Sequence, residues 1–217
     1  MIKFFFSSIG QKIQIAFTGI SLAIFLMFHL FNNLVLFTGA DNFNKMVQFL
    51  KSIHLFVRIL EAGLVIIVLL HIINAIATTI KNRKANNGKY AVTSDTAPKS
   101  SKTMIWSGLV ILFFFVIHLR YYWYTFQNMA KDADFFNLML KDEFGFLGHT
   151  PTAIFYIIAI LLIASHLKHG FTSVFKTIGM PLKYRESIIK YMAFIFWAII
   201  PSGFILVVVY IQYLSKL

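Results

Sequence analysis

Five long apolar stretches, separated by polar segments, set the pattern of this chain. A helix rises about 1.5 Å per residue, so about twenty apolar residues cross the hydrocarbon core of a bilayer. The pattern predicts an all-α integral membrane protein with one transmembrane domain, residues 1–217, and five spans: 13–37, 54–80, 103–124, 151–175 and 191–214. The last span contains Pro201 and Gly203 in its middle, where we expect a kink.

The polar connections indicate how the chain lies in the membrane. Residues 81–102 form the only long polar stretch, with six basic residues and one acid, and are predicted to be a cytoplasmic loop. Of the 20 Lys and Arg residues, 13 fall at the amino terminus, in this loop, and in the last turns of the fourth span or after it, where Lys168 is counted. The positive-inside rule therefore predicts a cytoplasmic amino terminus and an outer carboxyl terminus, in a multi-pass protein of the cell inner membrane. The connections 38–52 and 125–150 are then outer loops.

Composition narrows the chemistry further. The chain is 59% hydrophobic and 13% charged, with a net charge of +12 and no cysteine. Disulfides, thiolate-bound iron–sulfur clusters and covalent haem attachment through cysteine are excluded. The first apolar run is as long as a span and carries a histidine near its far end, so we expect it to be retained rather than cleaved. The basic inner segments suit anionic lipid or soluble protein subunits, and no nucleic acid partner is expected.

Each of the first four spans carries one histidine deep in its apolar run: His29, His71, His118 and His166. An ionisable side chain at that depth is costly and is kept where it faces a cavity, a partner or a cofactor. A single such histidine is often only hydrogen-bonded between helices. Four of them on four successive spans favour a common role.

The depth of these histidines indicates that role. We take the inner ends of the four helices at Ile13, Ile80, Met104 and Phe175. By the helical rise, His29 and His118 then lie about 24 and 21 Å from the inner side, and His71 and His166 both about 14 Å. Two layers of paired imidazoles in a helix bundle are expected for two stacked haems, each iron held by two histidines.

A weak internal repeat accompanies the histidines. Thr18-Gly19 lies just over ten residues before His29, and Ser107-Gly108 stands in the same relation to His118. Small residues let either a flat macrocycle or a neighbouring helix approach the backbone closely. Both interpretations stay open.

Three motifs carry a resemblance to a known family: FTGISLAIFLMFHL in the first span, SG…VIHL in the third and HLKHGFTSVFKTIG in the fourth. With five spans, the chain resembles the cytochrome b subunit of succinate dehydrogenase and fumarate reductase, in the class where one membrane polypeptide carries two haems b. The resemblance covers essentially the whole chain. It implies that His29 and His118 bind the distal haem, near the outer face, and that His71 and His166 bind the proximal haem, near the cytoplasm.

The family also bears on the haem surroundings. Its members have glycines four and thirteen residues after the fourth-span ligand, as Gly170 and Gly179 stand to His166. His169 is then a packing, hydrogen-bonding or propionate neighbour. Further residues at inner positions are expected near haem propionates, although each also suits an interface anchor or a snorkelling side chain: Lys12, Gln14, Trp106 and Lys176.

Partners and substrate follow from the same resemblance. The membrane subunit docks a flavoprotein with covalent FAD and an iron–sulfur protein, within a complex that can form a higher oligomer. Electrons pass between these subunits and a membrane quinone, expected to be menaquinone, while the succinate site lies on a partner, so no catalytic residue is expected here. An acid near the connection of the first two spans is associated with quinol oxidation; Asp41 and Glu61 are the candidates. His54, near Arg58 and Glu61, either lines the quinone pocket or is solvated.

One position departs from the family. Some fumarate-using members have a glutamate two residues before the fourth-span ligand, where it assists proton movement, and this chain has Ala164. A proton path of that kind is therefore not expected.

Two other functions remain open. One is the haem-binding anchor of another respiratory complex, of the hydrogenase or formate dehydrogenase type. The other is a haem-free transporter with a histidine proton relay, which would need broken helices or inverted repeats. Neither feature is visible beyond Pro201.

Overall fold

The computed structural model describes the chain except for residues 1–4, 87–98, 180–186 and 188–190. Its described part is helical and contains no strand. Five helices are long and apolar enough to cross a membrane: Ser8–Thr38, His54–Asn82, Met104–Asn128, Thr150–Thr177 and Tyr191–Leu214. The predicted class, a multi-pass helical membrane protein with five spans, is confirmed at this level.

The first span begins earlier than predicted because of a helix cap. The Ser7 hydroxyl accepts a hydrogen bond from the Gly10 N–H at 3.0 Å, which satisfies one of the free donors at the start of α2, Ser8–Leu34. A 3₁₀ turn, η1 (Val35–Thr38), completes the span. Gly39 follows with a φ of +96°, a left-handed conformation that suits glycine and lets the chain turn away.

The two connections predicted as outer loops contain short helices. α3 (Ala40–Ser52) occupies residues 38–52 and buries Phe43 and Val47, four residues apart on one face. α7 (Phe135–Met139) lies between the third and fourth spans and is capped by the Asp134 side chain, which accepts from the Asn137 N–H. Both connections therefore contribute to the folded core.

The polar stretch 81–102 is a shorter connection than predicted. α4 (His54–Asn86) continues into it, and α5 (Lys99–His118) begins before its end. The remainder, residues 87–98, lies outside the described residues. After α5 the third span continues through a π-helical turn, η3 (Leu119–Trp123), into α6 (Tyr124–Asn128).

The fourth span is the uninterrupted α8 (Thr150–Thr177), whereas the fifth contains a second π-helical turn. This turn, η4 (Ile195–Ile199), directly precedes α10 (Ile200–Leu214). Pro201 lacks an N–H and cannot make the regular bond to the preceding turn, which explains an irregularity there. Gly203 then lets α10 approach Leu30 of α2 closely.

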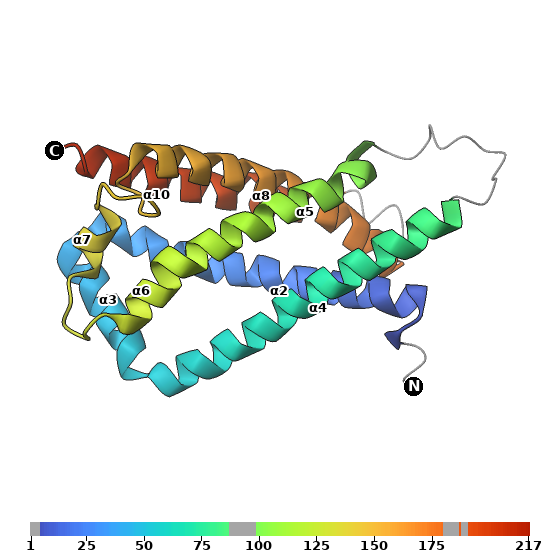
Figure 1. Ribbon diagram of the computed structural model, residues 1–217, viewed down its shortest axis with the longest axis horizontal. Helices are drawn as coiled ribbons and strands as arrows, with labels where there is room; N and C mark the ends of the chain where they lie inside the picture. The colour runs from blue at the N-terminus through green and yellow to red at the C-terminus, as the bar shows by residue number, and fades with distance from the viewer. Residues whose placement is uncertain (1–4, 87–98, 180–186, 188–190) are drawn as a thin grey trace.

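The long helices form an antiparallel bundle (Figure 1). α2 packs along α4, α5 packs along α8, and α10 packs against α2 and α8. α3 and α7 lie together at the end where the carboxyl terminus is found, here called the capped end, and α2 starts at the opposite end.

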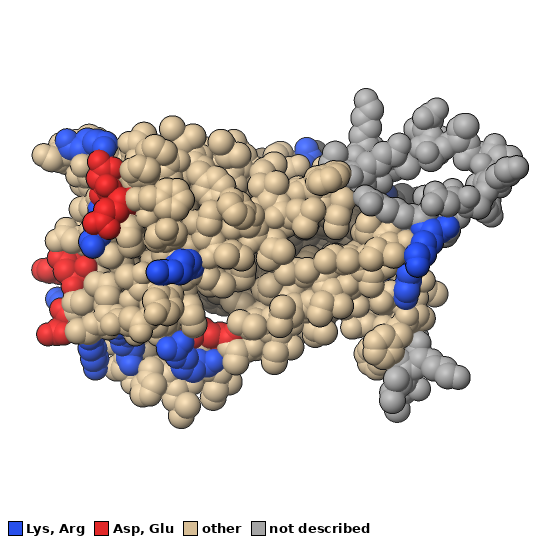
Figure 2. Space-filling model, viewed as in Figure 1, with Lys and Arg blue, Asp and Glu red and all other residues tan. Residues whose placement is uncertain are grey.

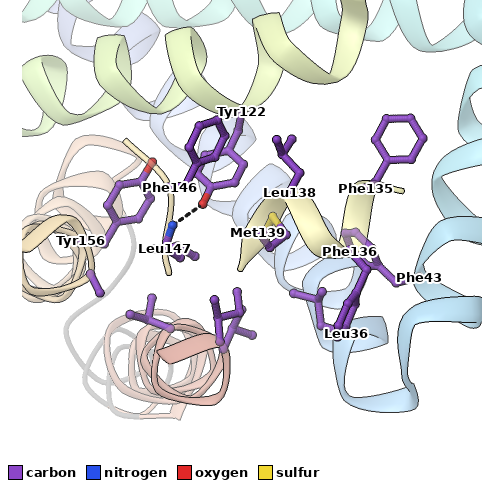
Figure 3. Packing of buried hydrophobic residues seen from close by; sticks show 14 of the residues in the cluster. Leu36, Phe43, Tyr122, Phe135, Phe136, Leu138, Met139, Phe146, Leu147 and Tyr156 are labelled. Atoms are coloured by element: carbon purple, nitrogen blue, oxygen red, sulfur yellow. Dashed lines mark hydrogen bonds between the residues drawn. The ribbon is translucent and has the colours of Figure 1, made fainter. Parts of the chain in front are cut away.

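The capped end has a tightly packed core (Figure 3). Phe135 of α7 is fully buried against Phe126, and its neighbour Phe136 packs against Phe43 with ring centroids 6.2 Å apart. The Tyr122 hydroxyl accepts a hydrogen bond from the buried Leu147 N–H at 2.8 Å. These contacts fix the connection between the third and fourth spans against the bundle.

The middle of the bundle is less filled. Asn74 is the only buried residue of α4 among those with described side chains, and α5 has none in its described part. α4 and α5 touch each other only slightly, and Figure 2 shows the surface hollowed between α4 and the α5–α6 helix. Because protein interiors are normally close-packed, this arrangement leaves room that side chains of the described residues do not occupy.

Candidate functional site

The four membrane histidines meet in two pairs. His29 of α2 and His118 of α5 have ring centroids 5.7 Å apart with planes at 85°, and are called the outer pair. His71 of α4 and His166 of α8 have ring centroids 6.5 Å apart with planes at 65°, and are called the inner pair. The same two pairs are predicted from the depths of the histidines along their helices.

The pairs lie at different depths along the bundle. The spans end at the capped end at Thr38, His54, Asn128 and Thr150. Counting the helical rise from these ends puts the outer pair about 14–15 Å away and the inner pair about 24–25 Å away. The two layers are therefore about 10 Å apart along the bundle.

The ring separations fit a metal held between two imidazoles. A metal–imidazole bond of about 2.0 Å on each side, plus about 1.1 Å from nitrogen to ring centre, gives about 6.2 Å between centroids. The observed 5.7 and 6.5 Å lie on either side of this value. No cluster of three or more His, Asp or Glu side chains occurs in the described part. A porphyrin supplies four nitrogens to its iron, so two protein ligands are enough.

Two hydroxyl groups contact the inner pair. Thr18 Oγ1 lies 3.0 Å from His71 Nδ1, and Ser107 Oγ lies 3.2 Å from His166 Nδ1. The glycine after each hydroxyl faces the same ring: a Cβ at Gly19 would lie 3.5 Å from His71 Cε1. The repeat noted in the sequence is thus also a repeat in structure, although it contacts the inner pair and not the histidines of its own helices.

Aromatic rings surround the outer pair. Phe25 stacks on His29 at 5.4 Å between centroids, and Phe114 stacks on His118 at 5.7 Å. The Tyr156 hydroxyl lies 3.4 Å from His118 Nδ1, a long contact. The outer pair is therefore in a more apolar setting than the inner pair.

The residues predicted to surround haem propionates are not brought together. Gln14 Oε1 accepts from Asn74 Nδ2 at 3.3 Å, and Gln14 Nε2 donates to the Phe5 carbonyl at 2.8 Å, so its amide already links α2 to α4. The side chains of the other four show no hydrogen bond or ion pair to described residues: Lys12, Trp106, His169 and Lys176. Lys12, Trp106 and Lys176 are exposed toward the ends of their helices opposite the capped end, and the propionate assignments stay predictions.

Part of the predicted quinone set lines a cavity near the capped end. His54 and Arg58 border an open cleft of about 320 Å³. Its other walls are Lys51, Gln127, Met129 and Lys131. Burial lowers the pKa of Lys51, which also donates to the Met129 carbonyl.

Glu61 stands beside this cleft at the centre of a polar cluster. Its carboxylate accepts from Arg58 Nη1 at 3.0 Å, Trp123 Nε1 at 3.0 Å and Gln127 Nε2 at 3.1 Å. Trp123 and Gln127 are absent from the sequence-based site. Both lie at the end of the third span, in or just after the aromatic run Tyr121–Tyr124. That position was the sequence signal that could have identified them.

Asp41 is not part of that cluster. It lies in the first turn of α3, and His54 follows the other end of the same helix. Their separation along α3 is about 20 Å by the helical rise. Asp41 and Glu61 therefore belong to different surroundings, and only Glu61 adjoins the cleft.

Comparison with protein-family models, with curated proteins and with solved structures finds no match for this chain.

Proposed function

We propose that this chain is the membrane-anchor cytochrome b subunit of a succinate:quinone oxidoreductase, a succinate dehydrogenase or fumarate reductase. The observation that carries the proposal is the pairing of four intramembrane histidines at two depths. An ionisable residue in a span is a functional candidate by default, and here each has a partner of the same kind. Two non-covalent haems b, when bound, supply one-electron carriers in series across the bilayer.

In this proposal the outer pair holds the distal haem and the inner pair holds the proximal haem. The ring of His166 faces His71 at 6.5 Å, which supports His166 over His169 as the fourth-span ligand. The sparse burial along α4 and α5 supports a bulky group between these helices. The aromatic rings around the outer pair keep water away from that layer.

The orientation belongs to the proposal as well. With the capped end outside, the amino terminus and the basic connections face the cytoplasm. Figure 2 shows acidic side chains gathered toward the capped end, in keeping with an outer face that is poor in net positive charge. The basic segments would dock the iron–sulfur subunit and the flavoprotein with covalent FAD, and would also attract anionic lipid of the inner membrane.

The cleft beside Glu61 is the proposed quinone site. It lies near the capped end, toward the layer of the outer pair. Arg58 and Gln127 provide donors for a quinone carbonyl, and the Glu61 carboxylate can take a proton from a quinol hydroxyl. Menaquinone is the proposed substrate. Asp41 is left out because it does not adjoin the cleft.

Histidine substitutions test the proposal through the number of haems. We expect the purified chain to bind about two haems by pyridine haemochrome assay, and each of His29→Ala, His71→Ala, His118→Ala and His166→Ala to bind about one. A double substitution within a pair should still leave about one haem, whereas a double substitution across the pairs should leave none. His149→Ala serves as the control and should retain both. His169→Ala tests the choice of the fourth-span ligand and should also retain both, because His166 is the proposed ligand.

The outcomes separate this function from its competitors. A wild-type chain without haem, in a preparation that preserves other cytochromes, contradicts the proposal and favours a transporter. Loss of both haems from every single variant contradicts the assignment of pairs. Co-purification with a flavin-containing subunit supports the succinate complex, whereas a molybdenum- or nickel-containing partner contradicts it.

A further inference from the structure

The hydroxyl groups of Thr18 and Ser107 each donate their single hydrogen to a backbone carbonyl. A hydroxyl has one hydrogen to donate and two lone pairs that accept. Thr18 Oγ1 donates to the Gln14 carbonyl at 2.7 Å and also lies 3.2 Å from the Ile15 carbonyl, and Ser107 Oγ donates to the Met104 carbonyl at 3.0 Å. Carbonyl oxygens can only accept, so the roles in both bonds are fixed. Toward any third group, each hydroxyl can act only as an acceptor.

The third group is in both cases a ring nitrogen of the inner pair. Thr18 Oγ1 lies 3.0 Å from His71 Nδ1, and Ser107 Oγ lies 3.2 Å from His166 Nδ1. A hydroxyl that gives its hydrogen to a carbonyl can bond Nδ1 only when Nδ1 carries the ring hydrogen. A neutral imidazole has one N–H, so its other nitrogen, Nε2, then carries the free lone pair that binds a metal.

The same arrangement, a hydroxyl followed by a glycine against a histidine ring, occurs at both histidines of the inner pair. α2 supplies Thr18 and Gly19 to the ring on α4, and α5 supplies Ser107 and Gly108 to the ring on α8. Thr18 is 3% exposed, so water does not compete for its bond. A Cβ at Gly108 would stand 3.8 Å from His166 Cε1, which shows how closely the helix backbone approaches the ring.

The outer pair lacks this arrangement. His118 Nδ1 has only the long 3.4 Å contact to the Tyr156 hydroxyl, and the described residues offer no hydrogen bond to the ring of His29. The outer pair therefore serves as an internal control when the hydroxyl groups at the inner pair are removed.

We propose that Thr18 and Ser107 are positioning residues that hold the two inner histidines with hydrogen on Nδ1 and Nε2 directed to iron. The inference rests on the haem sites proposed above and assigns two further residues to one of them. A hydrogen bond from Nδ1–H makes the opposite nitrogen a stronger electron donor to the metal. Stronger donation stabilises ferric iron, so losing the bond should raise the reduction potential of the inner haem. Loss of such a supporting bond also weakens metal-site affinity by about 10–100-fold.

The test uses Thr18→Val and Ser107→Ala in the full-length chain. Thr18→Val keeps the side-chain shape and removes the hydroxyl. Redox titration of the haem bands should show one component shifted to higher potential in each variant, a larger shift in the double variant, and the second component unchanged. Electron paramagnetic resonance of the ferric protein should change for the same haem only.

Conservative and matched variants separate this role from simple packing. Thr18→Ser and Ser107→Thr keep a hydroxyl and should restore the wild-type potential. Ser21→Ala is the control on α2, because its hydroxyl donates to the Phe17 carbonyl at 3.0 Å and contacts no histidine. It should leave both haems unchanged.

Each outcome bears on a definite claim. Two haems with unchanged potentials in Thr18→Val and Ser107→Ala overturn the inference and leave the proposed function intact. Loss of the inner haem from Thr18→Val with its retention in Thr18→Ser supports the inference. Its loss from both, or loss of the outer haem as well, points to a packing role and overturns it. A wild-type chain without haem refutes the proposed function itself.

Discussion

Gly203→Ala should disrupt the contact between α10 and α2. An added Cβ would lie 2.8 Å from Leu30 Cδ2 and 3.0 Å from Leu30 Cδ1. Carbon atoms in good contact are about 3.5–4.0 Å apart, so Leu30 must move by roughly 0.5–1 Å. Leu30 is 8% exposed and belongs to a buried cluster with Phe171, Phe196 and Ile200, so free space is scarce. Overpacking of this kind costs about 1–3 kcal/mol.

A second glycine isolates this packing cost. Gly63 lies within α4, and a Cβ there would meet nothing within 4 Å. Both substitutions replace glycine by alanine inside a helix, which improves helix propensity by about 1 kcal/mol in each case. The difference between the two variants therefore reports the contact with Leu30 alone. We expect Gly203→Ala to be less stable than Gly63→Ala by about 1–3 kcal/mol.

Reversible unfolding in mixed detergent micelles, followed by circular dichroism, measures this difference. Wild type, Gly63→Ala and Gly203→Ala should be compared at the same protein and detergent concentrations. If Gly203→Ala proves as stable as Gly63→Ala or more stable, α10 does not approach α2 as described, and the account of the fifth span is wrong.

Three further changes test other parts of the molecule. Tyr122→Phe leaves the buried Leu147 N–H without its acceptor and should lower the free energy of unfolding by about 1–3 kcal/mol; unchanged denaturant stability would contradict this. The Asn137 N–H holds the pKa of Asp134 below its ordinary value, so its stabilising effect is present above about pH 4 and is lost as pH falls through the lowered pKa. Asp134→Asn should therefore flatten the acid limb of the stability profile, and an unaltered limb would refute the capping role. On the proposed function, Glu61→Gln should slow quinol oxidation while both haem bands persist, and wild-type turnover would remove Glu61 from the proposed quinone site.

The transmembrane helices follow directly from the sequence because each apolar run is long enough to span a bilayer. The histidine pairs agree with the predicted layers for a related reason: depth depends only on position along a helix, and the helical rise is constant. Contacts across helices depend also on how each helix is rotated. Thr18 illustrates this, since the sequence associates it with His29 on its own helix and the structure sets it against His71.

The capped end was the least predictable region. α3 is amphipathic, with Phe43, Met46, Val47 and Leu50 at helical spacing, and this pattern is the sequence signal that the prediction of a loop missed. The π-helical turn η3 has no proline or glycine to mark it, since its residues are LRYYW. Glu61 was identified as an acid near the predicted outer end, but its partners Trp123 and Gln127 come from the last residue of that turn and from α6 after it.

The π-helical turn η3 has a consequence for the geometry of the third span. One extra residue in a helical turn changes the facing direction of everything after it by about 100°. His118 of this span therefore faces His29 of α2. Less than three turns later, Trp123 and Gln127 of the same span face Glu61 of α4. Deleting a single residue within Leu119–Trp123 would rotate one of these two sets away from its partners, so the turn fixes the direction of His118 relative to that of Trp123 and Gln127.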